Sequence, residues 1–450
     1  MKLNLNFDNV IGKIKPMHAV GQPPFTGGFQ SLNFKPIQIL KDAHVPYSRL
    51  HDVGGAFGGN RFVDIPNIFR DFDADENDPA SYDFAFTDVL IKAMMEYDVP
   101  PYFRLGVTIE NQSFVKAYRI HPPKDYGKWA RICEHIVRHY NEGWADGFHF
   151  GIKYWEIWNE PENREIPKLN QMWTGTAEQY YELYDVAAKH LKNCFGDKIK
   201  VGGYGACGFY GIFGDPEKYG LNVERRTEER YNSAKEDYRI NFFLGFMEYL
   251  KAHNTPIDFF SWHTYGTIDV ILVEADFVDN TLNKYGFGNI ETHLNEWNLS
   301  HDRNKNKGTS FASSNVMATM IGMQYKKTDM LMYYDSRFAA ISAYAGLYDV
   351  TTLEPSCVYY SLKAFGELYT LENQVECALG KDGVFAVAAK NGDKEMVILS
   401  NLEDDIVIET ELSQDFSAYL IDKDNFIVKT DLNPKEFTLR KNDVIVLKNY

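Results

Sequence analysis

An alternation of short apolar runs with longer amphipathic stretches constrains the fold of this chain most strongly. The apolar runs occupy residues 46–51, 65–72, 100–106, 152–158, 199–205, 257–263, 291–297 and 329–335. Helical patterns lie between them, as in residues 126–142 and 177–194. Such a βαβα order predicts a parallel sheet covered by helices. Eight units predict an α/β fold of the (β/α)8 or TIM barrel type.

A doubly wound open sheet is the structural rival of the barrel. Folds of that type that bind dinucleotides carry a G-x-G-x-x-G turn after the first strand. The glycine-rich segment at residues 54–60, GGAFGGN, lacks that spacing. We interpret it as a loop, and the barrel remains the predicted fold.

The pattern changes to short alternating strands with polar turns near the C-terminus. We assign residues 31–370 to the catalytic barrel and residues 371–450 to an all-β accessory domain, a β-sandwich. Residues 1–30 form an N-terminal segment, and its alternating stretch KLNLNF could add a strand to the β domain.

Composition narrows the class of partner. The chain has 450 residues and a formal net charge of −16, which argues against nucleic-acid and membrane partners because both need a concentrated basic surface. No apolar run near the N-terminus resembles a signal peptide, so a cytoplasmic location is expected. The five cysteines are scattered singly, which suits neither a disulfide framework nor a zinc site. A homo-oligomer is compatible with the sequence.

Two glutamates follow apolar runs at the ends of predicted strands. Glu160 follows the fourth run in KYWEIWNEPEN, and Glu296 lies at the end of the seventh in THLNEWN. They are 136 positions apart, about 45 for each of three βα units. Barrel active sites lie at the C-terminal ends of the strands, so both side chains are expected in one site. Glycoside hydrolases use two carboxyl groups that face each other across the bond to be cleaved.

Several motifs carry a family resemblance. WEIWNEPEN at residues 155–163 resembles the acid/base motif of clan A retaining glycosidases, and LNEWN at 294–298 resembles their nucleophile strand. SRLHD at 48–52, SWHTYG at 261–266 and the segment 345–365 are similar to elements of glycoside hydrolase family 39, the β-xylosidase and α-L-iduronidase family. The first motif alone marks the clan, and only the combination indicates the family.

The resemblance implies a role for each matching residue. Glu160 would be the general acid/base and Glu296 the nucleophile, while Asn159 would hold the sugar 2-hydroxyl. His263 and Tyr265 would lie beside the carboxylates, with Tyr265 donating a hydrogen bond that keeps Glu296 ionised.

Other matching residues would bind the sugar, although each has an alternative role. Arg49 and His51 would line the sugar subsite, but Arg49 could instead pair with an inward acid such as Glu156. Trp158 and Trp297 would form an apolar floor, or they could be packing residues. His263 could likewise be a core histidine.

The sequence departs from the family pattern at two strands. The resemblance implies that the eighth strand carries a tryptophan, whereas this chain has YYDSRF there, with Asp335 as a candidate substrate ligand and Arg337 nearby. The third strand carries Arg104, which could bind additional hydroxyls or a uronic carboxylate. These departures leave the identity of the sugar open.

The sequence therefore predicts a retaining exo-glycosidase of β-xylosidase type that acts on short oligosaccharides without a cofactor. An arabinosidase, a galactosidase, a uronidase and a non-catalytic carbohydrate-binding barrel are the alternatives. No metal is expected, because the twelve histidines include no H-x-H or H-E-x-x-H motif. The expected carboxyl separation is about 5 to 5.5 Å, close enough for ionised Glu296 to raise the pKa of Glu160.

Overall fold

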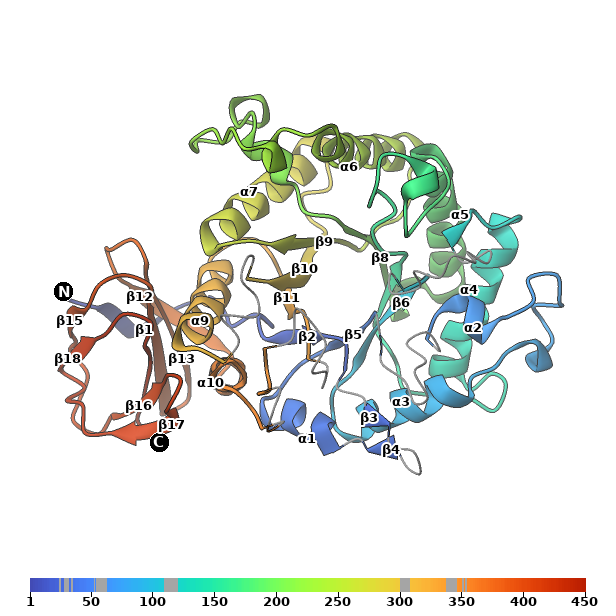
Figure 1. Ribbon diagram of the computed structural model, residues 1–450. Coiled ribbons are helices and arrows are strands. Elements are labelled where there is room, and N and C mark those ends of the chain that lie inside the picture. The colour runs from blue at the N-terminus through green and yellow to red at the C-terminus, as the bar shows by residue number, and fades with distance from the viewer. Residues whose placement is uncertain are drawn as a thin grey trace.

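A computed structural model describes residues 1–23, 26–27, 32–33, 35–51, 53, 63–108, 120–299, 308–336, 346–349, 352 and 354–450. The predicted loop at 54–60 and Arg337 lie outside these residues. Figure 1 shows a barrel ringed by helices, with a separate β domain beside α9 and α10.

Eight parallel strands close the barrel, which confirms the predicted fold class. In spatial order they are β2 (Ala19–Gly21), β5 (Ser48–Leu50), β6 (Pro101–Leu105), β7 (Tyr154–Ile157), β8 (Lys200–Ala206), β9 (Phe259–Tyr265), β10 (Glu291–Asn298) and β11 (Met330–Tyr333), which pairs with β2. Since all of these strands run in one direction, their C-terminal ends meet at one face of the barrel.

One predicted strand was wrong and one barrel strand was missed. The run at 65–72 begins with the short helix α2 (Ile65–Ile68), whose first turn contains Pro66. Proline suits a helix start because its φ is already helical and it has no N–H to leave unpaired. The strand that completes the set of eight is β2, which comes first in the chain. It lies within residues 1–30, the segment that the sequence had assigned outside the barrel. Residues 48–50 of SRLHD thus form the second barrel strand, β5. Glu160 still follows the fourth strand, β7, and Glu296 lies near the end of the seventh, β10.

Helices cover the outside of the barrel (Figure 1). They are α1 (Lys35–Asp42), α3 (Ala85–Glu96), α4 (Tyr126–Glu142), α5 (Ala177–Phe195), α6 (Ala234–His253), α7 (Ile268–Tyr285), α9 (Ser310–Gln324) and α10 (Cys357–Thr370). Local sequence fixes several of their ends. Thr176 and Gln179 form a capping box at the start of α5, and Gly143 ends α4 with a φ of +76°.

Short 3₁₀ helices lie in the connections. They are Pro79–Ser81, Pro167–Leu169, Gly196–Lys198, Tyr210–Phe213, Glu217–Tyr219 and Glu229–Tyr231. Three of them fall between β8 and α6, which makes this connection one of the longer excursions at the C-terminal face of the barrel.

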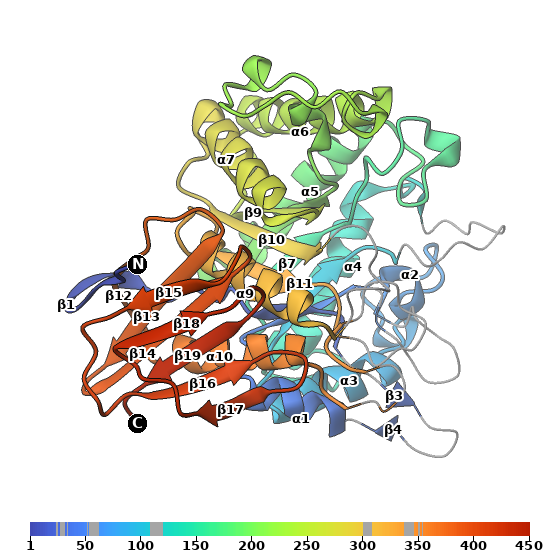
Figure 2. The same cartoon turned by 60° about the vertical axis from the view of Figure 1, so that its left-hand side comes forward.

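The β domain is built on a seven-stranded antiparallel sheet (Figure 2). Its order is β1 (Asn4–Lys13), β12 (Asn373–Ala378), β13 (Val384–Asn391), β14 (Lys394–Asn401), β19 (Val444–Lys448), β16 (Ser417–Ile421) and β17 (Phe426–Thr430). A two-stranded sheet of β15 (Ile406–Glu409) and β18 (Glu436–Leu439) shares its hydrophobic core. Another short pair joins β3 (Thr26–Gly27) and β4 (Leu32–Asn33). The N-terminal strand β1 thus joins the sheet of the C-terminal domain.

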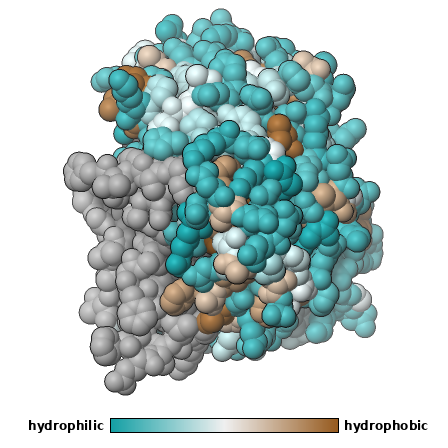
Figure 3. Space-filling view, turned by 90° about the vertical axis from the view of Figure 1, so that its right-hand side faces the viewer, coloured by the Kyte–Doolittle hydropathy of each residue, from teal (hydrophilic) through white to brown (hydrophobic). Residues whose placement is uncertain are grey.

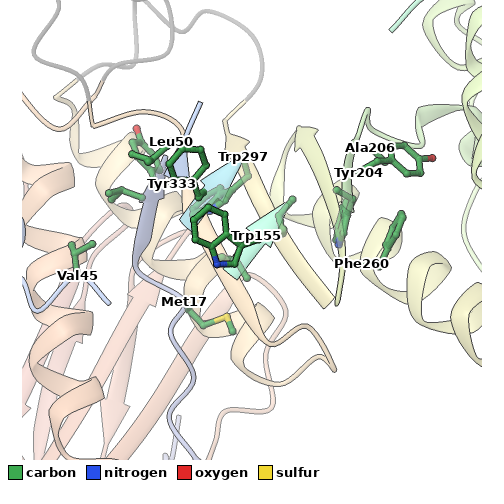
Figure 4. Packing of buried hydrophobic residues seen from close by; sticks show 14 of the residues in the cluster. Met17, Val45, Leu50, Trp155, Tyr204, Ala206, Phe260, Trp297 and Tyr333 are labelled. Carbon is green, nitrogen blue, oxygen red and sulfur yellow. The ribbon is translucent and has the colours of Figure 1, made fainter. Parts of the chain in front are cut away.

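Apolar side chains fill the barrel below the site and the space around it. Ala19, Tyr102, Tyr154, Phe259, Met330 and Met332 form one buried cluster. A larger cluster joins the strands to the helices, and Figure 4 shows Trp155, Phe260 and Trp297 within it. Burying one large apolar side chain contributes about 1.5–3 kcal/mol. The strands are therefore rigid supports for the polar residues at their ends.

The outer surface is mostly hydrophilic on the side that carries α2, α4 and α5, with hydrophobic residues in small groups (Figure 3). Among the helices of the described residues, none combines the length and the apolar character needed to cross a bilayer.

Candidate active site

A strained turn after β7 presents Glu160. Trp158 and Glu160 have φ values of +75° and +46°, in the left-handed region that non-glycine residues rarely adopt. The Glu160 N–H donates to the carbonyl oxygens of Tyr204 (3.2 Å) and Gly205 (3.0 Å) on neighbouring β8. This bond anchors the turn to the barrel. The buried strand thus ends in a carboxylate because the backbone turns over the mouth of the barrel at that point.

An irregularity in β10 directs Glu296 into the barrel. The register between β9 and β10 shifts between Leu294 and Glu296. Side chains of consecutive strand residues normally point to opposite faces, yet both Asn295 and Glu296 contact interior residues. Asn295 donates to Glu156 at 2.6 Å, and Glu296 accepts from Arg49 at 3.2 Å. A β-bulge re-aims a side chain in this way.

The two glutamates lie next to each other with His263 between them. One carboxylate oxygen of Glu160, one of Glu296 and one ring nitrogen of His263 all lie within 4.8 Å of one another. His263 Nδ1 is 2.9 Å from Glu160 Oε1 and 3.7 Å from Glu296 Oε2. The carboxylates are largely withdrawn from solvent, with side chains 12% and 9% exposed. Charge on either group is therefore felt strongly by the other.

Different donors hold the two carboxylates. Glu296 accepts hydrogen bonds from Arg49 Nη1 and from the Tyr265 hydroxyl. Glu160 accepts from Asn163 Nδ2 at 2.8 Å and contacts His263. The Tyr265 backbone N–H donates in turn to a neighbouring tyrosine hydroxyl at 2.7 Å, which fixes the end of β9. Each carboxylate thus has a defined orientation.

Arg49 joins the residues of the site. Its Nε donates to Glu156 at 2.7 Å, its Nη2 to Asn159 at 2.6 Å and its Nη1 to Glu296 at 3.2 Å. Burial lowers the pKa of Arg49, but the charges of Glu156 and Glu296 outweigh it and raise that pKa above its ordinary value. The two alternatives for Arg49 therefore coexist in the geometry, because it pairs with Glu156 and also contacts two residues of the site.

The pKa values of the two glutamates are shifted in the direction opposite to our expectation. Burial raises the pKa of Glu160, but the hydrogen bond and charge of His263 outweigh burial and lower it. Burial also raises the pKa of Glu296, and the nearby Glu160 charge adds to this rise. The cause is the shorter distance of His263 from Glu160.

Gly205 is a site residue that the sequence analysis missed. It has a φ of +60°, and a Cβ at this position would lie 3.0 Å from Arg49 Nη2, 3.0 Å from His263 Nε2 and 3.2 Å from Asn159 Oδ1. Its N–H donates to Ser261 Oγ at 2.8 Å. Only glycine leaves room for these side chains to meet. GGYG at the end of a predicted strand was the available signal.

The other predicted substrate ligands lie in two kinds of environment. His51 is buried directly after β5, and Asp335 is buried two residues after the end of β11, both at the C-terminal ends of their strands. Trp158 instead packs between Trp129 and Trp173, and its indole N–H donates to a backbone carbonyl at 2.9 Å. Trp297 is fully buried with its ring edge-on to a tyrosine at 5.5 Å.

Arg104 is fully buried beside Asp64 rather than lying unpaired. Its Nη2 donates to Asp64 Oδ1 at 2.6 Å and to the Thr108 hydroxyl at 3.3 Å. Asp64 also accepts from the Thr108 backbone N–H at 2.9 Å. The aspartate neutralises the charge of Arg104, so this pair supplies no net positive charge for a uronic carboxylate.

Within the part of the chain that the structure describes, two side-chain clusters have the donor atoms of a metal site. Glu160, His263 and Glu296 form the first, but both Glu296 oxygens already accept hydrogen bonds and the Arg49 guanidinium would repel a cation. Glu134, His190 and Cys194 form the second, on α4 and α5. There Glu134 already accepts from Arg138 at 2.7 Å and contacts His190 at 2.5 Å. Hydrogen bonding within the protein explains both clusters.

Comparisons with known proteins place this geometry in a family context. The sequence model described as "Glycosyl hydrolases family 39" matches residues 60–285, a range that contains Glu160 and ends before Glu296. A β-xylosidase of Caldicellulosiruptor saccharolyticus is 27% identical over 214 residues, which are 45% of this chain and 40% of that protein. A β-xylosidase of Geobacillus stearothermophilus is 23% identical over 217 residues, 46% and 35% of the two chains. The match thus spans less than half the length of these relatives.

Solved structures match the whole chain. A glucosidase from Croceicoccus marinus has a TM-score of 0.73 with 21% identity over 99% of this chain and 98% of that chain. A family 39 β-xylosidase from Caulobacter crescentus has a TM-score of 0.67 with 15% identity over 100% and 99%. At these identities the likeness shows a shared fold, which includes both the barrel and the β domain.

Proposed function

Because this chain belongs to glycosyl hydrolases family 39, we propose that it is a retaining glycosidase that releases a terminal sugar from short oligosaccharides. Glu160 serves as general acid/base and Glu296 as nucleophile. The observation that carries the proposal is the closeness of the two carboxylates, which have oxygens within 4.8 Å of each other. Retaining pairs stand about 5–5.5 Å apart, whereas inverting pairs are separated by about 6.5–9.5 Å to hold a water.

The reaction proceeds in two displacements. In the first, Glu296 attacks the anomeric carbon, the bond to the leaving oxygen breaks, and that oxygen takes a proton from Glu160. In the second, water attacks the same carbon, the ester bond to Glu296 breaks, and Glu160 takes the proton of the water. The chain needs no cofactor for either step. Two inversions give net retention.

Glu160 must hold a proton in the first step, although the hydrogen bond and charge of His263 lower its pKa. His263 Nδ1 contacts Glu160 Oε1 at 2.9 Å and fixes the orientation of that carboxyl beside the leaving oxygen. Once Glu296 is esterified its negative charge is gone, and Glu160 can receive the next proton from water.

The sugar is proposed to be xylose or a related neutral sugar. The two β-xylosidases to which this chain is similar support a β-xyloside as the substrate. The pairing of Arg104 with Asp64 speaks against a uronide, because the cation is already neutralised. A screen of chromogenic xyloside, arabinoside, galactoside, glucoside and uronide substrates decides among these sugars. A barrel that only binds carbohydrate would hydrolyse none of them.

Glu160→Ala tests the acid/base assignment. Hydrolysis of glycosides with poor leaving groups should fall by about 10²–10⁴-fold, because they depend on proton donation, while activated phenyl glycosides lose far less in the first step. Azide should partly restore turnover by attacking the ester without a general base. Glu165→Ala, in the same loop but exposed, is the control and should behave as wild type. Equal losses for both substrate types without an azide effect would remove Glu160 from this role.

A further inference from the structure

Gln22 occupies a strained position at the C-terminal end of the first barrel strand. It follows β2 directly and has a φ of +56°, in the left-handed region. Its N–H donates to the Arg49 carbonyl at 2.9 Å, and its own carbonyl accepts from the Ser336 hydroxyl. Neighbouring strands on both sides therefore hold the strained backbone. Backbone strain of this kind clusters at functional sites in proteins.

The amide of Gln22 is fixed at one end only. Its Nε2 donates to the Tyr334 hydroxyl. Gly21 has no side chain and so lets the Tyr334 ring come close, because a Cβ there would lie 3.2 Å from that ring. Gln22 is fully buried, yet its Oε1 has no hydrogen-bond partner within the described part of the chain. A buried acceptor without a donor is costly, so its presence calls for an explanation.

Gln22 is connected to the nucleophile by two routes. The Tyr334 ring lies edge-on to the Tyr265 ring at 6.2 Å, and the Tyr265 hydroxyl donates to Glu296. Arg49, whose carbonyl accepts from Gln22, donates to the other oxygen of Glu296. Gln22 is thus linked to Glu296 through Arg49 and through the Tyr334 and Tyr265 side chains.

We propose that Gln22 is a specificity-determining residue, whose Oε1 accepts a hydrogen bond from a sugar hydroxyl of the glycoside bound at Glu296. The inference rests on the proposed glycosidase function. Because the resemblance assigns the 2-hydroxyl to Asn159, the 3- and 4-hydroxyls are the ones left for Gln22. An amide oxygen attracts a hydroxyl and repels a carboxylate. Gln22 therefore selects a neutral sugar with a free hydroxyl at C3 or C4.

Paired substrate and protein changes test this inference. The kcat/KM of wild type and of Gln22→Met is measured on one activated glycoside and on its 2-, 3- and 4-deoxy forms. Wild type should lose about tenfold on either the 3-deoxy or the 4-deoxy form, as expected for one neutral hydrogen bond. Gln22→Met should lose about tenfold on the parent glycoside but little on that same deoxy form, because the bond is already missing.

A matched control separates this effect from the general cost of removing a buried amide. Gln374 on β12 is also buried with one unpartnered amide atom, in the sheet of the β domain. Gln374→Met should leave the discrimination between parent and deoxy substrates unchanged. Gln22→Asn, which keeps the amide but withdraws its oxygen, replaces the methionine variant if that variant does not fold.

The outcomes are distinguishable. Similar losses of Gln22→Met on the parent and on all deoxy forms would overturn the inference and leave the glycosidase function in place. A kcat/KM of Gln22→Met on the parent glycoside equal to that of wild type would also overturn the inference and leave the glycosidase function in place. A wild-type protein that hydrolyses no glycoside would overturn the proposed function and this inference with it.

Discussion

Replacing Glu162 by glutamine should make the stability of the protein less dependent on pH. Glu162 is the second glutamate of the W-N-E-P-E motif and is fully buried. Its Oε1 accepts from the Cys207 N–H at 2.6 Å, while its Oε2 has no hydrogen-bond partner among the described residues. Burial is the main cause that raises its pKa from 4.5 to about 8, and the charge of Glu160 adds to the rise. The folded protein therefore holds a proton on Glu162 near neutral pH.

The sign and size of the effect follow from this pKa. A carboxyl whose pKa is higher in the folded than in the unfolded state binds its proton more tightly when folded. Its contribution to stability is fully present below pH 4.5 and is lost as pH rises through about 8. The difference between these values, at about 1.4 kcal/mol per pH unit, sets an upper limit near 5 kcal/mol. Glutamine keeps an acceptor for Cys207 and cannot ionise.

Urea unfolding at pH 5, 6.5 and 8 measures this effect. The unfolding free energy of Glu162→Gln relative to wild type should increase by about 3 kcal/mol between pH 5 and pH 8. Glu165→Gln, an exposed change three positions along the same loop, should give a difference that does not vary with pH. A difference between Glu162→Gln and wild type that stays constant or decreases as pH rises would refute the reasoning.

Two further predictions concern residues that surround the carboxylates. His263→Ala should raise the pKa of Glu160, because the ring is what outweighs burial there; NMR titration of ¹³C-labelled glutamate measures it, and an unchanged or lower pKa would contradict the assignment. Gly205→Ala should lower kcat/KM at least tenfold, because its Cβ would lie 3.0 Å from Arg49 Nη2. Gly220→Ala has a similar φ of +70° with no atom within 4 Å, so it should lower only Tm slightly; equal kcat/KM in both variants would exclude a role for the Gly205 contact.

The sequence predicted the barrel because most of its strands are long enough to show a pattern. β9 and β10 contain seven and eight residues, and each ends in polar side chains. β2 has only three residues and was missed, whereas the equally short β5 was found within the longer run at 46–51. The apolar run at 65–72 was misassigned because periodicity cannot separate a short helix from a short strand. The motifs around Glu160 and Glu296 were found because their residue order is informative in itself.

Features that depend on distances between separate strands could not be predicted. The reversed pKa shifts arise because His263 lies 2.9 Å from Glu160 and 3.7 Å from Glu296. Gln22 was missed together with its strand. The packing of Trp158 against Trp129 and Trp173 depends on the positive φ of Trp158. A tryptophan in the sequence does not indicate a positive φ.

The anomeric form of the first product tests the central claim most directly. If Glu296 attacks the anomeric carbon and water then displaces it, each step inverts the configuration and the product keeps that of the substrate. Proton NMR of a chromogenic glycoside recorded before mutarotation should therefore show the retained anomer first, and Glu296→Ala should abolish its formation. Appearance of the opposite anomer first would contradict the double displacement, because it would require a water between Glu296 and the sugar.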